Sequence, residues 1–222
     1  MRTHGGAVSV DAVAGAEKRL DVRLQLHAEE KERIGALAAT LVSSNSVLML
    51  NAGTTTLSVV RHLHKRRDLT IATNNLRIAM EVSPKIVRDV YLFGGSVRHV
   101  GQATIGPVRF PSPSGRDLQL RCDLALISVG AVSARGGYST SNLSEAVMMG
   151  EMMERAARVV ILADSSKFTE PLFAQIADLD RADYLVTDAQ PPADLAAALD
   201  EAGVEVLIAA GEENADTSES QR

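Results

Sequence analysis

Short apolar runs alternate with longer amphipathic segments along most of this chain. The first clear helix is expected from Ala28, because apolar residues from Ile34 onward recur on one face behind the acidic pair Glu29 and Glu30. Apolar runs of strand length follow, most of them with a helical segment between them. This alternation predicts an α/β fold with a mostly parallel sheet and helices on both faces. The runs lie at Val47 to Leu50, Leu69 to Ala72, Val90 to Phe93, Leu124 to Val129, Val159 to Ala163, Tyr184 to Val186 and Val204 to Ala209.

The two ends of the chain lack this pattern. Residues 1–27 show no steady period and contain several glycines, which predicts a linker with one short strand near Arg19 to Leu26. Residues 28–210 are expected to form the α/β domain. The polar, acidic residues 211–222 are predicted to be a disordered tail.

Size and composition are those of a globular domain. The chain has 222 residues, of which 45% are hydrophobic and only 3% aromatic, so aliphatic side chains must build the core. A formal net charge of −5 gives the domain as a whole no basic surface for a nucleic-acid backbone, so we expect another segment to make any DNA contact. No apolar run reaches membrane-spanning length and the first residues lack a secretory signal, which predicts a cytoplasmic protein without membrane contact.

Cysteine and histidine usage predicts no metal and no other cofactor. The one cysteine, Cys122, cannot form an intramolecular disulfide and adjoins an apolar run, so a buried and unreactive thiol is expected. The five histidines show no ligand spacing with a carboxylate.

The most informative polar segment follows the run at Val47. Asn51 is followed by Ala-Gly-Thr-Thr-Thr, and apolar residues at helical spacing come next, so Gly53 to Thr56 should be the turn that opens a helix. Such a turn presents backbone N–H groups and a positive dipole end, which suit a phosphate. The alternative is that Thr54 or Thr55 is only the N-cap of a helix that binds nothing.

Polar residues also follow other apolar runs, where ligands of open parallel sheets bind. Their hydroxyls, amides, glycines and one lysine suit a phosphorylated polyol. Structural alternatives remain: Asn74 as a helix cap, Gly94 and Gly95 as a turn, Lys167 as a solvated lysine, and Glu145 as a first-turn acid. The candidate binding residues are Asn51, Gly53, Thr54, Thr55, Thr56, Thr73, Asn74, Gly94, Gly95, Gly130, Glu145 and Lys167.

Two further clusters receive structural interpretations. The basic residues between Arg61 and Arg67 end a helix, where cations favour the negative end of the dipole, so we interpret them as a solvated helix terminus. Met148, Met149, Met152 and Met153 recur at helical spacing and predict a flexible packing face or a subunit contact.

The order and spacing of several motifs resemble the effector-sensing domain of the DeoR family of bacterial transcription regulators. The resemblance runs from residue 2 to about residue 209 and adds Asp123 to the candidate binding residues. The motifs are Arg2-Thr-His-Gly-Gly-Ala, Glu30-Lys-Glu-Arg-Ile, Asn51-Ala-Gly-Thr-Thr-Thr, Thr73-Asn-Asn, Leu92-Phe-Gly-Gly, Asp123-Leu-Ala-Leu-Ile and Asp164-Ser-Ser-Lys-Phe.

This resemblance implies a ribose-5-phosphate isomerase-like fold, of the NagB/RpiA/CoA-transferase-like class, used as a sensor. It further implies a repressor that binds a phosphorylated sugar effector and forms a homo-oligomer, a dimer or tetramer. In the family the segment at Arg2 follows a winged helix-turn-helix domain. We therefore expect contact with operator DNA only through such a domain, which this sequence does not include.

Two positions depart from the family pattern. Asn51 stands where the family usually has Asp, and Met149 falls about where many members have a basic residue. The general site is expected to persist, whereas the usual effector is in doubt.

Two other functions remain open. The first is a sugar-phosphate isomerase on the same fold, with Glu145, Asp123 and Lys167 as base and electrophile, although the isomerase's own aspartate and glycine-lysine motifs are not reproduced. The second is a protein that acts by joining full-length relatives in mixed oligomers.

Overall fold

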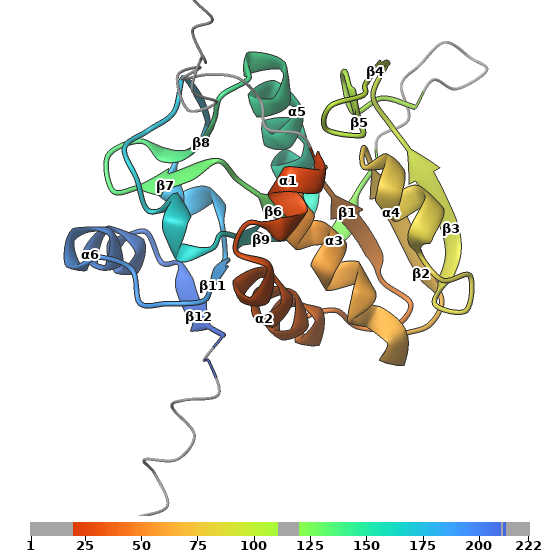
Figure 1. The fold of residues 1–222 in the computed structure, drawn as a ribbon, viewed down its shortest axis with the longest axis horizontal. Coiled ribbons are helices and arrows are strands. Elements are labelled where there is room, and N and C mark those ends of the chain that lie inside the picture. Colours follow the sequence, from red (N-terminus) through yellow and green to blue (C-terminus); the bar gives the residue numbers. More distant parts are fainter. Residues whose placement is uncertain (1–19, 111–119, 210, 212–222) are drawn as a thin grey trace, which may run out of the picture.

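A seven-stranded parallel sheet forms the centre of the computed structural model, which describes residues 20–110, 120–209 and 211 (Figure 1). Its strand order is β12-β11-β9-β6-β1-β2-β3. Each predicted apolar run overlaps one of these strands, so the expected parallel sheet is confirmed. The strands are β1 (Val47–Leu50), β2 (Leu69–Thr73), β3 (Val87–Leu92), β6 (Cys122–Ser128), β9 (Ala156–Leu162), β11 (Tyr184–Thr187) and β12 (Glu205–Ile208).

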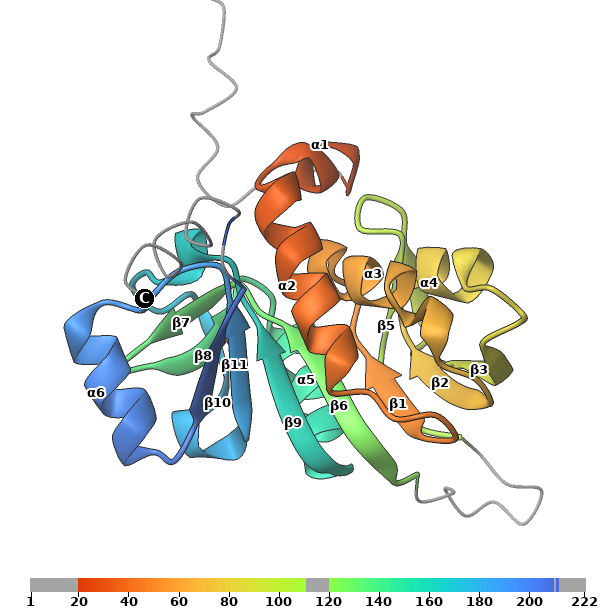
Figure 2. The same ribbon diagram turned by 90° about the horizontal axis from the view of Figure 1, so that it is seen from below.

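Helices cover both faces of this sheet, also as predicted (Figure 2). Alternate side chains of a strand point to opposite faces, so Leu124 and Leu126 pack with α2, α3 and α4, while Ala125 and Ile127 pack with α5 and α6. The helices are α1 (Leu20–Gln25), α2 (Ala28–Thr40), α3 (Thr54–Arg61), α4 (Leu76–Glu81), α5 (Leu143–Glu154) and α6 (Ala193–Glu201), with short 3-10 turns η2 (Leu63–Lys65), η3 (Ser165–Lys167) and η4 (Leu179–Arg181).

Two small antiparallel sheets accompany the main one and were not predicted. The strands β7 (Ala131–Ser133), β8 (Gly137–Thr140) and β10 (Ala174–Ala177) form one of them. The hairpin of β4 (Ser96–Arg98) and β5 (Ala103–Ile105) forms the other. These short strands lack the continuous apolar runs that mark the strands of the main sheet, so the sequence pattern does not reveal them.

The prediction of a strand near Arg19 to Leu26 is wrong, because Leu20–Gln25 form helix α1. The buried Leu20 and the half-buried Leu24 share one face of a helical turn. Tertiary contacts hold this short helix at both ends. At its start the Leu20 N–H donates to the Val100 carbonyl, 3.1 Å away, and at its end Lys31 donates to the carbonyls of Arg23 and Leu26. The rest of the predicted linker up to residue 19 and the predicted tail, apart from Gly211, lie outside the described residues.

The core contains the predicted inert thiol and the methionine cluster. Cys122 is a buried free cysteine, and burial raises its pKa to about 12. Met148, Met149, Met152 and Met153 are all buried between α5 and the sheet, so they form a packing face and not a subunit contact. Within the described part of the chain, no helix is long and apolar enough to cross a membrane.

The strand order reverses between β1 and β6. From β1 the chain continues to β2 and β3 on one side, and it then returns to β6 on the other side of β1. The crevice beyond the carboxyl ends of two such strands is the usual ligand position in open parallel sheets.

Candidate functional site

A cavity of about 480 Å³ lies at this point of strand reversal. Its volume falls within the roughly 300–1,000 Å³ of small-molecule sites. Its walls come from the carboxyl ends of four strands, β1, β2, β6 and β9. The β4–β5 hairpin, the first turn of α5 and the end of α1 complete them. Four cationic side chains line it against two carboxylates, although the whole chain has a net charge of −5: Arg23, Lys31, Arg98 and Lys167, with Glu145 and Asp164.

The turn between β1 and α3 ends at Gly53, which is the N-cap of α3. The proposal that Thr54 or Thr55 is the N-cap is therefore wrong. Glycine has no side chain to accept from the first-turn N–H groups, so these donors stay without a side-chain cap. Thr54 and Thr55 line the cavity, and within the described residues neither hydroxyl has a hydrogen-bond partner.

Gly53 and Thr56 hold this turn and do not line the cavity. A Cβ on Gly53 would lie 2.5 Å from the Cβ of Ser128, so only glycine fits against the end of β6. The Thr56 hydroxyl accepts from the Gly53 N–H at 3.1 Å and lies 2.8 Å from the Asn51 carbonyl, to which it donates. Both predicted binding residues thus have a structural explanation.

Asn51 joins β1 to β6 across the point of strand reversal. Its Nδ2 donates to the Ser128 carbonyl at 2.7 Å, and its Oδ1 accepts from the Ser128 N–H at 2.9 Å. Nδ2 also lies 3.0 Å from Sδ of Met149. The two positions that depart from the family pattern are therefore in contact, and the Asn51 amide has protein partners at both ends.

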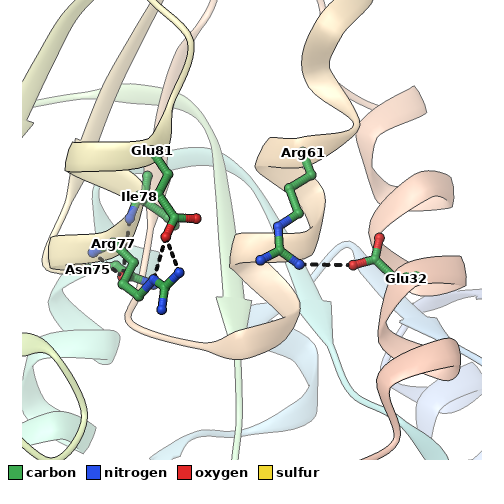
Figure 3. A network of polar contacts seen from close by, with 6 residues as sticks. All are labelled: Glu32, Arg61, Asn75, Arg77, Ile78 and Glu81. Carbon is green, nitrogen blue, oxygen red and sulfur yellow. Dashed lines mark hydrogen bonds and ion pairs between the residues drawn. The ribbon is translucent and has the colours of Figure 1, made fainter. Parts of the chain in front are cut away.

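The two asparagines after β2 have different environments. Asn75 caps α4, because its Oδ1 accepts from the N–H groups of Arg77 and Ile78 at 2.9 and 3.3 Å (Figure 3). Asn74 is not a cap: it lines the cavity, and its Nδ2 donates to the Thr104 carbonyl at 2.8 Å. Thr73 does not line the cavity, and its buried hydroxyl donates to the Leu50 carbonyl at 2.7 Å.

Lys31 is a buried cation in the cavity wall, with only 8% of its surface exposed. Its Nζ donates to the Arg23 carbonyl at 2.7 Å and also to the Leu26 carbonyl, both at the end of α1. Burial lowers the pKa of Lys31, while the nearby carboxylate of Asp164 acts in the opposite direction. Any anion in the cavity would stabilise the charged form of this lysine.

Glu145 lies in the first turn of α5 and also lines the cavity. One carboxylate oxygen pairs with Arg98 of the hairpin at 3.0 Å, and the other accepts from the Thr140 hydroxyl at 3.3 Å. Its backbone N–H donates to Oδ1 of Asn142, which caps the helix. Glu145 thus links the hairpin to the end of β8.

Gly130 and Lys167 complete the predicted residues that meet at the cavity. Lys167 belongs to η3, whose N-cap Asp164 accepts from the Ser166 N–H at 3.2 Å. The structure thus brings together Asn51, Thr54, Thr55, Asn74, Gly130, Glu145 and Lys167.

Asp123 lies at the wrong end of the sheet for the predicted role. It is near the start of β6, roughly 16 Å from the carboxyl end at about 3.3 Å per residue. Its Oδ2 accepts from the Val47 N–H at 2.8 Å, which ties β6 to the start of β1. A second cavity at this end, of about 530 Å³, contains none of the predicted residues.

Gly94 and Gly95 form a turn outside the cavity, as their structural alternative proposed. Gly94 has a φ of +104°, and an added Cβ would lie 2.7 Å from the Thr104 hydroxyl. The Gly95 N–H donates to the Ile105 carbonyl at 3.0 Å. These glycines let the chain between β3 and β4 lie close against β5.

Sequence reasoning missed three of the four cations at the cavity. Lys31 offered a signal, because it shares a helical face with the buried Ile34 and Ala38. Arg23 and Arg98 offered none, since they lie on the unexpected helix α1 and on the unexpected hairpin.

Part of the basic cluster between Arg61 and Arg67 is paired with a carboxylate of α2. Arg61 pairs with Glu32 of α2 at 3.2 Å (Figure 3). Glu32 also lies 2.9 Å from Nε2 of His62, so part of the basic cluster ties the end of α3 to α2. Among described residues, no group of His, Cys, Asp and Glu is arranged to hold a metal.

Comparisons with known proteins agree on one family. A family model described as "DeoR C terminal sensor domain" matches residues 26–189. The HTH-type transcriptional regulator GlpR of Haloferax volcanii is 33% identical over 93% of this chain and 78% of its own length. The HTH-type transcriptional repressor GlcR of Bacillus subtilis is 32% identical over 97% of this chain and 81% of its own.

Solved structures show a likeness of fold. eIF2B beta from Chaetomium thermophilum has a TM-score of 0.50 at 13% identity, over 78% of this chain and 53% of that chain. Ribose 5-phosphate isomerase A from Methanocaldococcus jannaschii has a TM-score of 0.42 at 13% identity, over 65% of this chain and 56% of that chain.

Proposed function

The chain belongs to the DeoR family of transcription regulators as a C-terminal sensor domain, and from this premise we propose that its cavity binds a phosphorylated sugar or polyol as effector. The observation that carries the proposal is the excess of cations around a cavity at the point of strand reversal. In a chain of net charge −5, such a local excess favours an anion.

The phosphate belongs at the start of α3. The first-turn N–H groups have no side-chain cap, and the unpartnered hydroxyls of Thr54 and Thr55 are beside them. Lys31 and Lys167 add positive charge to the same cavity. Backbone donors, hydroxyls and ammonium groups together match the acceptor oxygens of a phosphate.

The names of relatives agree with this ligand class. The protein of Escherichia coli called glycerol-3-phosphate regulon repressor is 27% identical over 86% of this chain. We take from this name the class of small phosphorylated polyols, which sets the range of compounds to test.

Lys31 supplies a physical link between the ligand and the regulator. Its Nζ now binds the carbonyls of Arg23 and Leu26 at the end of α1. The third donor of this ammonium group is available to a phosphate, which draws Nζ toward the cavity and away from these carbonyls, so occupancy loosens α1 at one end. In this way binding changes the segment through which the sensor connects to residues before Leu20.

We propose that the protein is a sensor and not an isomerase. Glu145 and Lys167 both reach the cavity, but the carboxylate of Glu145 is paired with Arg98 and Asp123 lies at the opposite end of β6, which supports the sensor over the enzyme alternative. A cytoplasmic location, a homo-oligomeric state and operator binding through a helix-turn-helix domain remain predictions that follow from this function.

Calorimetric titration with paired compounds tests the proposal. Phosphorylated sugars and polyols should bind, and their unphosphorylated parents should not. A concentration near 100 times Kd should raise the free energy of unfolding by about 2.7 kcal/mol. Lys167→Met should weaken binding, whereas Lys65→Met, outside the cavity, should not. If no phosphorylated compound of a broad panel binds, the proposal is wrong.

Hydrogen exchange in the same samples tests the link to α1. Backbone amides of residues 20–26 should exchange faster with ligand than without it. If the exchange rates of these amides do not change at full occupancy, the proposed binding still stands, but Lys31 has no role in signalling.

A further inference from the structure

Asn74 carries a hydrogen-bond acceptor that has no partner among the described residues. Its side chain is buried, with 1% of the residue exposed, and it lines the cavity. Oδ1 has no hydrogen-bond partner, whereas Nδ2 donates to the Thr104 carbonyl at 2.8 Å. A buried acceptor without a donor costs free energy, which a ligand donor in the cavity would restore.

The orientation of this amide follows from its neighbours. A flipped amide would place Oδ1 against the Thr104 carbonyl, so that two acceptors would face each other. The backbone of Asn74 is held by the same residue, because its carbonyl accepts from the Thr104 N–H at 2.9 Å. The hairpin therefore fixes the amide with Nδ2 toward the protein and Oδ1 without a protein donor.

The unpartnered oxygen restricts the chemistry of the group that meets it. A phosphate, carboxylate or carbonyl oxygen has no proton to donate and would be repelled. An ammonium group would be a donor, but four cations already line the cavity against two carboxylates. A neutral hydroxyl satisfies both conditions.

We infer that Asn74 Oδ1 is a subsite for a ligand hydroxyl, so that the cavity selects anions that carry a hydroxyl over anions that do not. The inference rests on the proposed function and sharpens it. The start of α3 supplies donors for the phosphate, and the end of β2 supplies an acceptor for the polyol. A ligand is thereby bound in one orientation.

Two matched pairs of compounds test the inference. Glycerol 3-phosphate is compared with propyl phosphate, and sorbitol 6-phosphate with hexyl phosphate, by calorimetric titration of the wild-type protein. For at least one pair, the hydroxylated compound should bind about tenfold more tightly, as expected for one added hydrogen bond. Asn74→Ala should abolish this preference, so that both compounds of the pair bind it with equal affinity. Asn75→Ser, outside the cavity and still able to cap α4, should keep the preference.

A second measurement does not depend on a variant that folds. In NMR titrations of the wild-type protein, the side-chain amide signals of Asn74 should shift with a hydroxylated phosphate and not with its alkyl partner. A preference that persists in Asn74→Ala, or Asn74 signals that respond equally to both compounds, overturns the inference while the proposed function stands. If none of the four compounds and no other phosphorylated compound binds, the proposed function fails and the inference fails with it.

Discussion

The carboxyl ends of β1 and β2 are neighbours in the sheet, yet their asparagines have opposite hydrogen-bonding states. Leu50 pairs with Thr73 in the register, so Asn51 and Asn74 follow at equivalent positions. The Asn51 amide has protein partners on its oxygen and on its nitrogen. The Asn74 amide has a protein partner only on its nitrogen.

This difference separates a residue that builds the site from one that is available to a ligand. Asn51 and Thr56 hold the β1 turn in place, and what remains available there is a set of donors. At β2 Asn75 caps the helix, and what remains available is the acceptor of Asn74. Neighbouring strand ends thus present opposite chemistry to one cavity.

The largest effect is expected from distortion of the donor end. In Gly53→Val the new Cβ would lie 2.5 Å from the Cβ of Ser128, so the valine side chain has no room. We expect the free energy of unfolding to fall by about 1–3 kcal/mol, as for other overpacked sites, and phosphate binding to be lost. Urea unfolding and calorimetric titration measure the two effects.

Gly150→Ala is the matched control for this substitution. Gly150 lies within α5. A Cβ added there would lie 3.5 Å from its nearest neighbour, the Ile176 carbonyl oxygen, which is an ordinary contact distance. This variant should be at least as stable as the wild type, because alanine favours a helix. Normal phosphate binding by Gly53→Val would mean that the turn is not the phosphate site.

A charge exchange at Asn51 should change stability by a similar amount but leave the phosphate donors of the turn in place. Asn51→Asp turns a buried carboxylate toward the Ser128 carbonyl, and Met149→Lys buries an ammonium group nearby. Each single variant should lose about 1–3 kcal/mol of unfolding free energy, since a buried polar group is left unpaired. The double variant should recover at least about 1 kcal/mol through the new ion pair.

Unfolding of the four proteins in urea completes this double-mutant cycle. Additive losses would show that the contact between Asn51 and Met149, at 3.0 Å, carries no coupling. Coupling would show that the two departures from the family pattern form one unit.

The sequence predicted the main sheet well because its strands are buried on both faces. Runs such as Leu124 to Val129 are apolar without interruption, which distinguishes them from their surroundings. Helix α1 and the β4–β5 hairpin are short, and contacts distant in sequence hold them, such as the one between Leu20 and Val100. Propensity within so few residues is too weak to reveal them.

The candidate site was predicted in part, for a related reason. Residues after apolar runs, such as Asn74 and Lys167, do reach the cavity, because the carboxyl ends of parallel strands meet at one edge. Residue type does not reveal which of these side chains already have backbone hydrogen-bond partners. Thr55 lines the cavity, whereas the hydroxyl of Thr56 next to it is bonded to the carbonyls of Asn51 and Gly53. That distinction requires the three-dimensional hydrogen-bond network.

The smallest and most specific effect concerns the protonation of Lys31. Burial lowers the pKa of this lysine below its ordinary 10.5, and a phosphate needs the charged form. Affinity should therefore decrease as the pH rises from about 7.5 toward 10.5, by no more than tenfold per pH unit for one proton. The phosphate is already fully ionised in this range, because its second pKa is near 6.

The free energy of unfolding of the unliganded protein should rise with pH, whereas the affinity for phosphate falls, and the lowered pKa of Lys31 is the cause of both trends. Below pH 10.5 the unfolded chain holds the Lys31 proton more firmly than the folded chain, so the contribution of Lys31 to unfolding free energy rises with pH. Lys31→Arg stays charged throughout and should lose both trends, while Lys65→Arg should keep them. Calorimetric titration and urea unfolding at several pH values measure the pair of slopes. If affinity and stability decline together in the wild type and in Lys31→Arg alike, general alkaline weakening explains the data, and Lys31 is not the cation that meets the phosphate.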